Sequence, residues 1–122
     1  MSDVSHLSAA ASLVARREVA MLPRLLKAGE QVIDVCHGTS DGRPAVLVVT
    51  DCRVLFMQRR RLWGVDVEST LLARIRSVED HMGVRHATVV VDAAGRVFEV
   101  GDVDRGLAQV FCARLRAQLP TQ

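Results

Sequence analysis

The residues best suited to chemistry on a charged ligand form one short run, Gln58-Arg59-Arg60-Arg61-Leu62-Trp63-Gly64. Arginine forks bind phosphate and carboxylate groups through paired hydrogen bonds, and tryptophan favours the boundary between water and an apolar phase. If the run is a loop between two strands, Arg59, Arg60, Arg61 and Trp63 form a candidate surface for an anionic ligand or a partner. At about 1 kcal/mol per basic residue near an anionic leaflet, such a surface adheres weakly to membranes. The alternatives are a protein or oligomer contact and a solvated loop whose Trp63 folds back onto the domain.

A second motif, Thr50-Asp51-Cys52-Arg53, separates two apolar runs at residues 45–49 and 54–57. Both runs are short, the first is rich in β-branched residues, and four residues are too few to reverse two helices. The pattern therefore predicts a β-hairpin in which each strand is buried on both faces. Arg53 is a candidate ligand group, but we expect Thr50, Asp51 and Arg53 to act as a turn motif held by local hydrogen bonds.

Residue types for metal or nucleophilic chemistry occur without the spacing that such chemistry needs. Cys36 and His37 are adjacent on a predicted strand, so they face opposite ways and make no ligand pair with His81 or His86. No nucleophile elbow or glycine-rich phosphate loop is present. We predict no metal, no cofactor and no catalytic residue. An enzyme or small-ligand carrier is a further alternative, which a deep pocket with converging polar groups would favour.

The composition argues against nucleic acid as the partner. The 122-residue chain has a net charge of +2, yet residues 30–102 contain 9 basic and 11 acidic residues, a balance of −2. Duplex DNA binding needs a broad basic face, and single-strand binding needs stacking aromatics. Aromatic residues make up only 3% of the chain, and tyrosine is absent.

Three cysteines without CxxC spacing are typical of reduced thiols rather than a disulfide framework. No apolar stretch approaches the ~18–20 residues of a membrane span, and Asp3 stands where a signal peptide needs positive charge. We expect a cytoplasmic protein, with a peripheral position at the inner membrane surface if the arginine run binds lipid.

Hydrophobic periodicity predicts about seven short strands between two helical segments. Residues 6–28 are predicted to be helical, with a break at Leu22 because of Pro23 and a left-handed cap at Gly29. Asp104 is predicted to cap a final helix whose apolar positions are Leu107, Phe111, Leu115 and Leu119. The strands are predicted at residues 30–36, 45–49, 54–57, 64–70, 74–80 with a bulge or a strand start near Ser77, 86–93 and 96–102, and residues 38–44 are predicted to be a loop.

Four segments, LLKAGEQVIDV, VLVVTDCRVLF, LLARIRSV and FEVGDVDRGLAQVFCARL, resemble the bacterial pleckstrin-homology-like (PH-like) and GRAM-like domains. Those families show a Gly-Glu before the first strand, a Thr-Asp-x-Arg turn between the second and third, and an Ile-x-x-Val before the fifth. The resemblance covers residues 25–119. It implies a mainly β (α+β) fold, a seven-stranded antiparallel, partly open barrel or sandwich with a C-terminal capping helix. Here an extra N-terminal helix precedes it.

The resemblance implies a PH-like domain at residues 30–119 and leaves 1–29 as an N-terminal helical segment, broken at Pro23, which either covers the barrel or presents an apolar stripe to a partner. It also implies a non-enzymatic binding or assembly module. The loop that is basic in phosphoinositide-binding relatives offers His37 and Arg43 against Asp41. We therefore expect protein–protein contacts or self-association, with anionic lipid as the alternative. Exposed strand edges offer one route to self-association.

Overall fold

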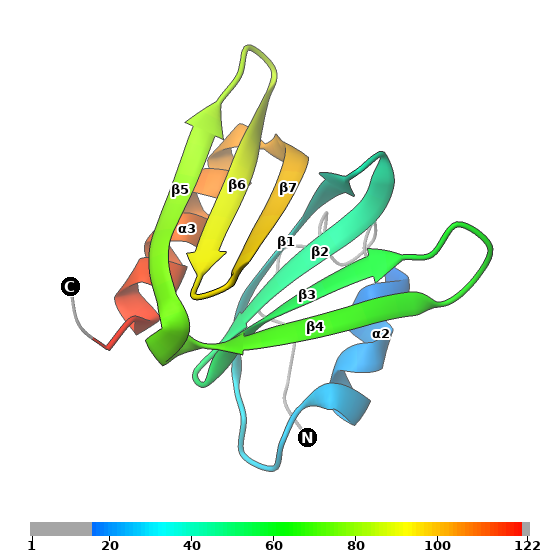
Figure 1. Cartoon of the computed structure of the whole chain (residues 1–122), viewed down its shortest axis with the longest axis vertical. Helices are drawn as coiled ribbons and strands as arrows, with labels where there is room; N and C mark the ends of the chain where they lie inside the picture. The colour runs from blue at the N-terminus through cyan, green and yellow to red at the C-terminus, as the bar shows by residue number, and fades with distance from the viewer. Residues whose placement is uncertain (1–15, 121–122) are drawn as a thin grey trace.

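Seven antiparallel strands form one sheet in the order β4-β3-β2-β1-β7-β6-β5 in the computed structural model, which describes residues 16–120. The outer strands β4 and β5 follow each other in sequence through the short 3₁₀ helix η1 (Leu72–Arg74), but the sheet does not close (Figure 1). The bounds are β1 (Val32–Ser40), β2 (Arg43–Thr50), β3 (Arg53–Arg59), β4 (Val65–Leu71), β5 (Ile75–Met82), β6 (His86–Ala93) and β7 (Arg96–Asp104).

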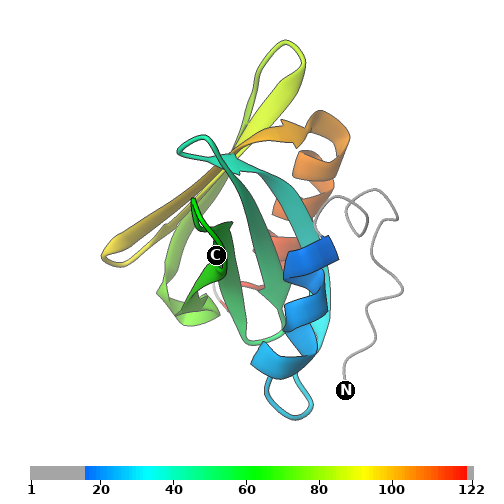
Figure 2. The same ribbon diagram turned by 90° about the vertical axis from the view of Figure 1, so that its right-hand side faces the viewer.

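Two helices cover separate parts of this sheet. Helix α2 (Arg16–Leu25) lies on the outer face of the β1–β4 half, and helix α3 (Arg105–Gln118) lies against β1, β5, β6 and β7 (Figures 1 and 2). Each helix seals its own apolar cluster. Leu22 of α2 closes the outer cluster, and Phe111 and Leu115 of α3 close the inner one. The predicted PH-like architecture, with its open sheet and C-terminal helix, is confirmed.

The β2–β3 hairpin is buried on both faces, as the two apolar runs predicted. Val49 pairs with Val54 at its closed end. Along β2, Leu47 and Val49 point into the inner cluster, whereas Val46 and Val48 point into the outer cluster under α2. Because side chains alternate along a strand, β2 links the two cores.

Strands β1 and β7 approach each other unusually closely. Among the described residues they meet at one ladder pair, Thr39 opposite Gly101, and beyond it the two strands diverge. A Cβ placed on Gly38 would lie 1.9 Å from the backbone oxygen of Gly101. Glycine at position 38 is therefore required for the two halves of the sheet to join.

Two local predictions hold at the level of single residues, and a third holds in part. The Asp104 side chain accepts a hydrogen bond of 2.9 Å from the backbone N–H of Leu107 and so caps α3. The bulge near Ser77 is present as a register shift between Ile75 and Ser77. The buried stripe of α3 is slightly rotated from the predicted one and consists of Ala108, Phe111, Cys112 and Leu115.

The predicted loop at residues 38–44 is wrong. Strand β1 continues to Ser40 and β2 begins at Arg43, so only Asp41 and Gly42 form the turn. Both have positive φ, 52° and 75°, as a tight type I′ hairpin turn requires. Gly38 and Pro44 resemble turn residues in the sequence, but the first allows the approach of β7 and the second pairs with Thr39 in the ladder.

The predicted helix break at Leu22 is also wrong. Helix α2 runs through Pro23 to Leu25. Proline near the end of a helix removes a single backbone hydrogen bond, and the exposed side of α2 accommodates its ring. Gly29 does have the predicted left-handed φ, 82°, in the connection to β1. The N-terminal part of the predicted 6–28 helix lies outside the described residues.

The close approach of β1 and β7 leads to the first prediction. Gly38→Ala places a methyl group against backbone that cannot rotate away, so we expect the free energy of unfolding to fall by more than about 2 kcal/mol. Urea unfolding followed by circular dichroism measures this loss. Gly106→Ala, in the first turn of α3, is the control and should be neutral or slightly stabilising. Equal stability of the Gly38 variant and the wild type would contradict the close approach.

Candidate functional site

The Thr50–Arg53 turn is tied to a distant part of the chain by an almost completely buried carboxylate. Glu30, only 2% exposed, receives two hydrogen bonds from the Arg53 guanidinium, from Nε at 2.9 Å and from Nη2 at 3.1 Å. Arg53 Nη2 also donates to the backbone oxygen of Leu25 at 2.7 Å, at the end of α2. This network joins the β2–β3 hairpin to the connection between α2 and β1.

Thr50 and Asp51 each hold a different part of this turn. The Thr50 hydroxyl donates to Glu30 Oε2 at 2.6 Å and accepts the backbone N–H groups of Cys52 and Arg53, both at 3.0 Å. Asp51 Oδ1 accepts the backbone N–H of Gln31 at 3.0 Å. The local hydrogen bonds therefore come from Thr50, whereas Asp51 and Arg53 reach other segments of the chain.

The surroundings of Glu30 favour its ionised form. Burial by itself raises the pKa of Glu30, but the hydrogen bonds from Arg53, from Thr50 and from the backbone N–H of Lys27 outweigh it. The net result lowers the pKa of Glu30 from 4.5 to about 2. A carboxylate held in this way stabilises the fold at neutral pH.

The three consecutive arginines have three different environments. Arg59 is paired with Glu18 of α2, Nε to Oε1 at 2.6 Å, and the Glu18 side chain is only 1% exposed. Arg60 is paired with Asp66 of β4 at 2.8 Å, and both side chains are more than half exposed. Arg61 is exposed and makes no ion pair with any residue in the range 16–120. The run therefore does not present three equivalent cations.

The β3–β4 turn presents its apolar side chains to water. Leu62 is 85% exposed and Trp63 is 77% exposed. The backbone N–H of Arg60 donates to the oxygen of Gly64, and Gly64 has a φ of 92°, which closes the hairpin. Figure 1 shows this hairpin extending beyond the rest of the sheet. We call residues 60–64 the hairpin tip.

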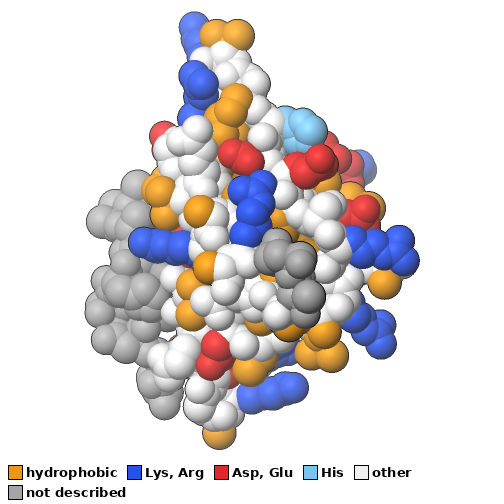
Figure 3. Space-filling view, turned by 90° about the vertical axis from the view of Figure 1, so that its left-hand side faces the viewer, with side chains coloured by type: hydrophobic (Ala, Val, Ile, Leu, Met, Phe, Trp, Pro, Cys, Tyr) orange, Lys and Arg blue, Asp and Glu red, His pale blue; other side chains and the backbone are white. Residues whose placement is uncertain are grey.

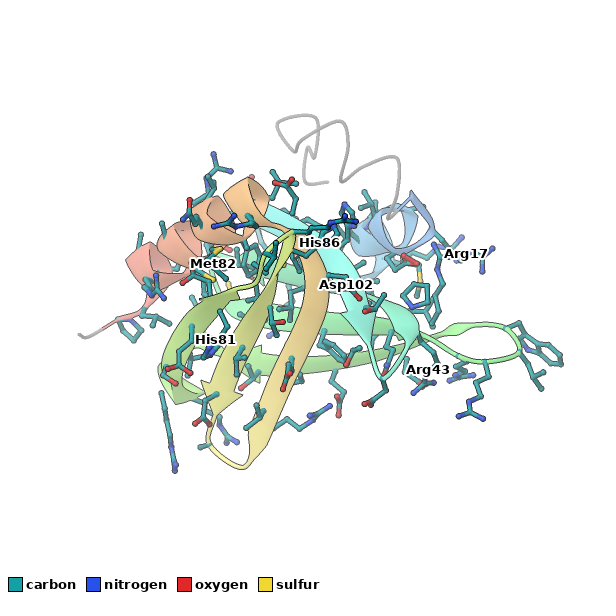
Figure 4. All side chains as sticks on the ribbon, turned by 90° about the horizontal axis from the view of Figure 1, so that it is seen from above. Arg17, Arg43, His81, Met82, His86 and Asp102 are labelled. Carbon is teal, nitrogen blue, oxygen red and sulfur yellow. The ribbon has the colours of Figure 1, made fainter. Side chains whose placement is uncertain are left out.

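A surface cleft of about 370 Å³ lies where β1 and β7 diverge. Figure 4 labels Asp102 at this junction, where its side chain accepts a hydrogen bond of 2.6 Å from the Thr39 hydroxyl. Within the described part of the chain, the cleft carboxylates of Asp41 and Glu99 have no cationic partner. The cleft is lined by Thr39, Ser40, Asp41, Phe56, Gln58, Arg96, Val97, Glu99 and Gly101.

The positive charge of Arg96, which lines this cleft, is neutralised by an ion pair. Arg96 is paired with Glu68 of β4 at 2.6 Å, and its guanidinium lies over the ring of Phe98, 4.6 Å from the centroid. Asp41 and Glu99 therefore leave the cleft net negative. Val97, 48% exposed, adds accessible apolar surface.

The buried thiols and the half-buried imidazole of the described residues have shifted pKa values. Burial raises the pKa of Cys112 to about 11 and that of Cys36 well above its ordinary value, so neither is a thiolate at neutral pH. Burial lowers the pKa of the half-buried His37. No group of three or more His, Cys, Asp or Glu side chains suited to a metal ion occurs among residues 16–120. In the same range, no helix has the length and apolar character of a membrane span.

Sequence reasoning missed the residues that partner the predicted ones. Glu30 belongs to the Gly-Glu pair of the family resemblance, but its pairing with Arg53 spans 23 residues and has no local signature. Glu18 interrupts the apolar face of α2, and that interruption marks the position from which it reaches Arg59. The cleft joins side chains of β1, β3 and β7, so only the fold brings them together.

Charged side chains are mixed on the face shown in Figure 3, where lysine and arginine alternate with acidic and neutral groups among the described residues. In Figure 4, Arg17 and Arg43 lie on the side of the molecule from which the hairpin tip extends. Basic groups near the tip thus come from three segments, while the cleft beside it is acidic.

Solved structures with a similar fold are PH domains. The PH domain of Shewanella amazonensis SB2B has a TM-score of 0.59 at 14% identity and covers 94% of each chain. A DUF1696 family protein with a PH domain from Shewanella loihica PV-4 has a TM-score of 0.58 at 14% identity, covering 91% of this chain and 93% of that one. The PH domain of USP37 has a TM-score of 0.55 at 14% identity, covering 72% and 98%.

No family model and no curated protein matches the sequence. The similarity therefore lies in the fold, which is that of a PH domain.

The buried carboxylate yields the second prediction. Because the folded-state pKa of Glu30 lies below its ordinary value, its stabilisation is complete above pH 4.5 and is lost as the pH falls toward 2. We expect Glu30→Gln to lower the free energy of unfolding by about 2–3 kcal/mol at pH 7 and by much less at pH 3. Urea unfolding over this pH range measures the difference. Glu79→Gln, an exposed carboxylate, is the control, and a pH-independent loss in the Glu30 variant would contradict the account.

Proposed function

We propose that this chain is a non-enzymatic PH-like module that makes protein–protein contacts, its own self-association included, through the hairpin tip. The observation that carries the proposal is the exposure of Leu62 and Trp63, at 85% and 77%, side by side on a protruding turn. Tryptophan and arginine are enriched at interface hot spots, because they combine a large contact area with directional polar groups.

The ion pairs of the arginine run favour protein over lipid as the partner. Membrane adhesion grows with the number of cations free to face the leaflet, at about 1 kcal/mol for each. Arg59 is paired with Glu18 and Arg60 with Asp66, which leaves Arg61 as the member of the run that has no ion pair among residues 16–120. One arginine beside a tryptophan is a weak lipid anchor but a common interface anchor.

The hairpin tip also has the rigidity that an interface needs. Its base is fixed by the Arg59–Glu18 pair under α2, and its turn is closed by the Arg60–Gly64 hydrogen bond. A preorganised loop loses little conformational entropy on binding. We place the module in the cytoplasm, since its three cysteines are free thiols.

The test is the solution mass of the protein by light scattering across a concentration series. We expect a defined oligomer, and we expect the double variant Leu62→Ser with Trp63→Ser to be monomeric at concentrations where the wild type associates. Val84→Ser is the matched control, because Val84 is 93% exposed at the β5–β6 turn and should leave the mass unchanged.

Co-sedimentation with phosphatidylserine vesicles at low salt tests the lipid alternative on the same proteins. A monomeric wild type that sediments with the vesicles, and stops doing so when Arg59, Arg60 and Arg61 are replaced by alanine, would replace the protein-contact proposal with a lipid-binding one. A wild-type protein that stays monomeric and does not sediment with the vesicles would contradict both the protein-contact proposal and the lipid alternative.

A further inference from the structure

The hairpin tip and the neighbouring cleft are complementary in charge and in surface chemistry. The tip carries Arg61, which has no ion pair among residues 16–120, next to exposed Leu62 and Trp63. The cleft carries Asp41 and Glu99, also without cationic partners in that range, next to the accessible surface of Val97. Each of the two surfaces lacks what the other supplies.

The two surfaces lie side by side but cannot satisfy each other within one chain. Gln58 of β3 lines the cleft, and the tip begins two residues further along the same hairpin, which leads away from the sheet. A short closed hairpin cannot fold back onto its own strand. A second copy related by a two-fold axis, in contrast, places each tip on the cleft of the other, since a two-fold interface uses the same patch twice.

We propose that the cleft between β1 and β7 is the docking site for the hairpin tip of a second copy of this chain. In this arrangement Trp63 of one copy packs on the exposed Val97 of the other, and Arg61 faces Glu99 and Asp41. The cavity of about 370 Å³ is within the size range of small-molecule pockets and large enough for a tryptophan side chain. The inference rests on the proposed function and specifies its partner and its receiving surface.

The ion pair between Arg96 and Glu68 leaves the cleft open to an incoming cation. Arg96 is neutralised by Glu68 and is held over Phe98, so it does not repel an incoming arginine as an unpaired cation would. Buried or half-buried like charges across an interface cost several kcal/mol, so reversing one charge should be decisive.

The test is a charge exchange read by light scattering and sedimentation equilibrium on the full chain. We expect Arg61→Glu alone and Glu99→Arg alone each to weaken association by roughly tenfold or more. Combining both substitutions in one chain should restore association, and so should mixing the two single variants, because both contacts of the mixed dimer are then complementary. Arg85→Glu, an exposed arginine on the β5–β6 turn, is the control and should change nothing.

The outcomes separate this inference from the proposed function. If the Leu62→Ser, Trp63→Ser variant is monomeric while Glu99→Arg associates like the wild type, the tip is an interface but the cleft is not its receptor. A wild type that stays monomeric overturns both. Circular dichroism verifies folding of each variant, and Asp41→Asn removes a cleft charge with a residue that tolerates positive φ, so it gives a second, gentler measurement.

Discussion

The ion pair between Glu30 and Arg53 is the constraint on which the rest of this structure depends. It places a charged pair in a nearly dry position and satisfies it with the Thr50 hydroxyl, the Lys27 backbone N–H and the Leu25 backbone oxygen. Buried charges are tolerated only when they are paired and hydrogen-bonded in this way. The pair therefore fixes where α2 ends and where β2 turns into β3, so α2 lies over the outer apolar cluster and closes the second core.

Strand β3 connects the Glu30–Arg53 ion pair to the candidate site. Strand β3 begins at Arg53, in the network, and ends at Arg59, which is anchored by Glu18 of α2. Both ends of the strand are thus held by carboxylates from the segment that precedes β1. The hairpin tip projects from a strand that is fixed at both ends, and the cleft opens beside it because Gly38 lets β7 cross β1 and then diverge. The PH-like fold supplies the frame, and this chain's own side chains supply the surface chemistry.

Much of the fold could be predicted from local pattern, since the residues at 45–56 alternate between two buried faces and leave four residues for a turn. The capped helix after Asp104 and the bulge near Ser77 follow from the same kind of reasoning. For the candidate site, the sequence predicts the residues but not their environments. Arg59, Arg60, Arg61 and Trp63 are adjacent in sequence, but their different environments depend on Glu18 and Asp66, which come from α2 and β4. The local pattern around Gly38 is that of a loop, because the role of this glycine is its close approach to the backbone oxygen of Gly101 on β7, far along the chain. Long-range pairing of this kind leaves no periodic signal.

The fluorescence of Trp63, the single tryptophan of the chain, tests the central claim most directly. In the isolated domain the indole is 77% exposed, so its emission should be that of an indole in water and should be quenched freely by acrylamide. If the tip docks into the cleft of a second copy, raising the protein concentration shifts the emission to shorter wavelength and protects it from the quencher, in parallel with the rise in mass. An emission spectrum that stays that of exposed indole while light scattering shows association would contradict the account.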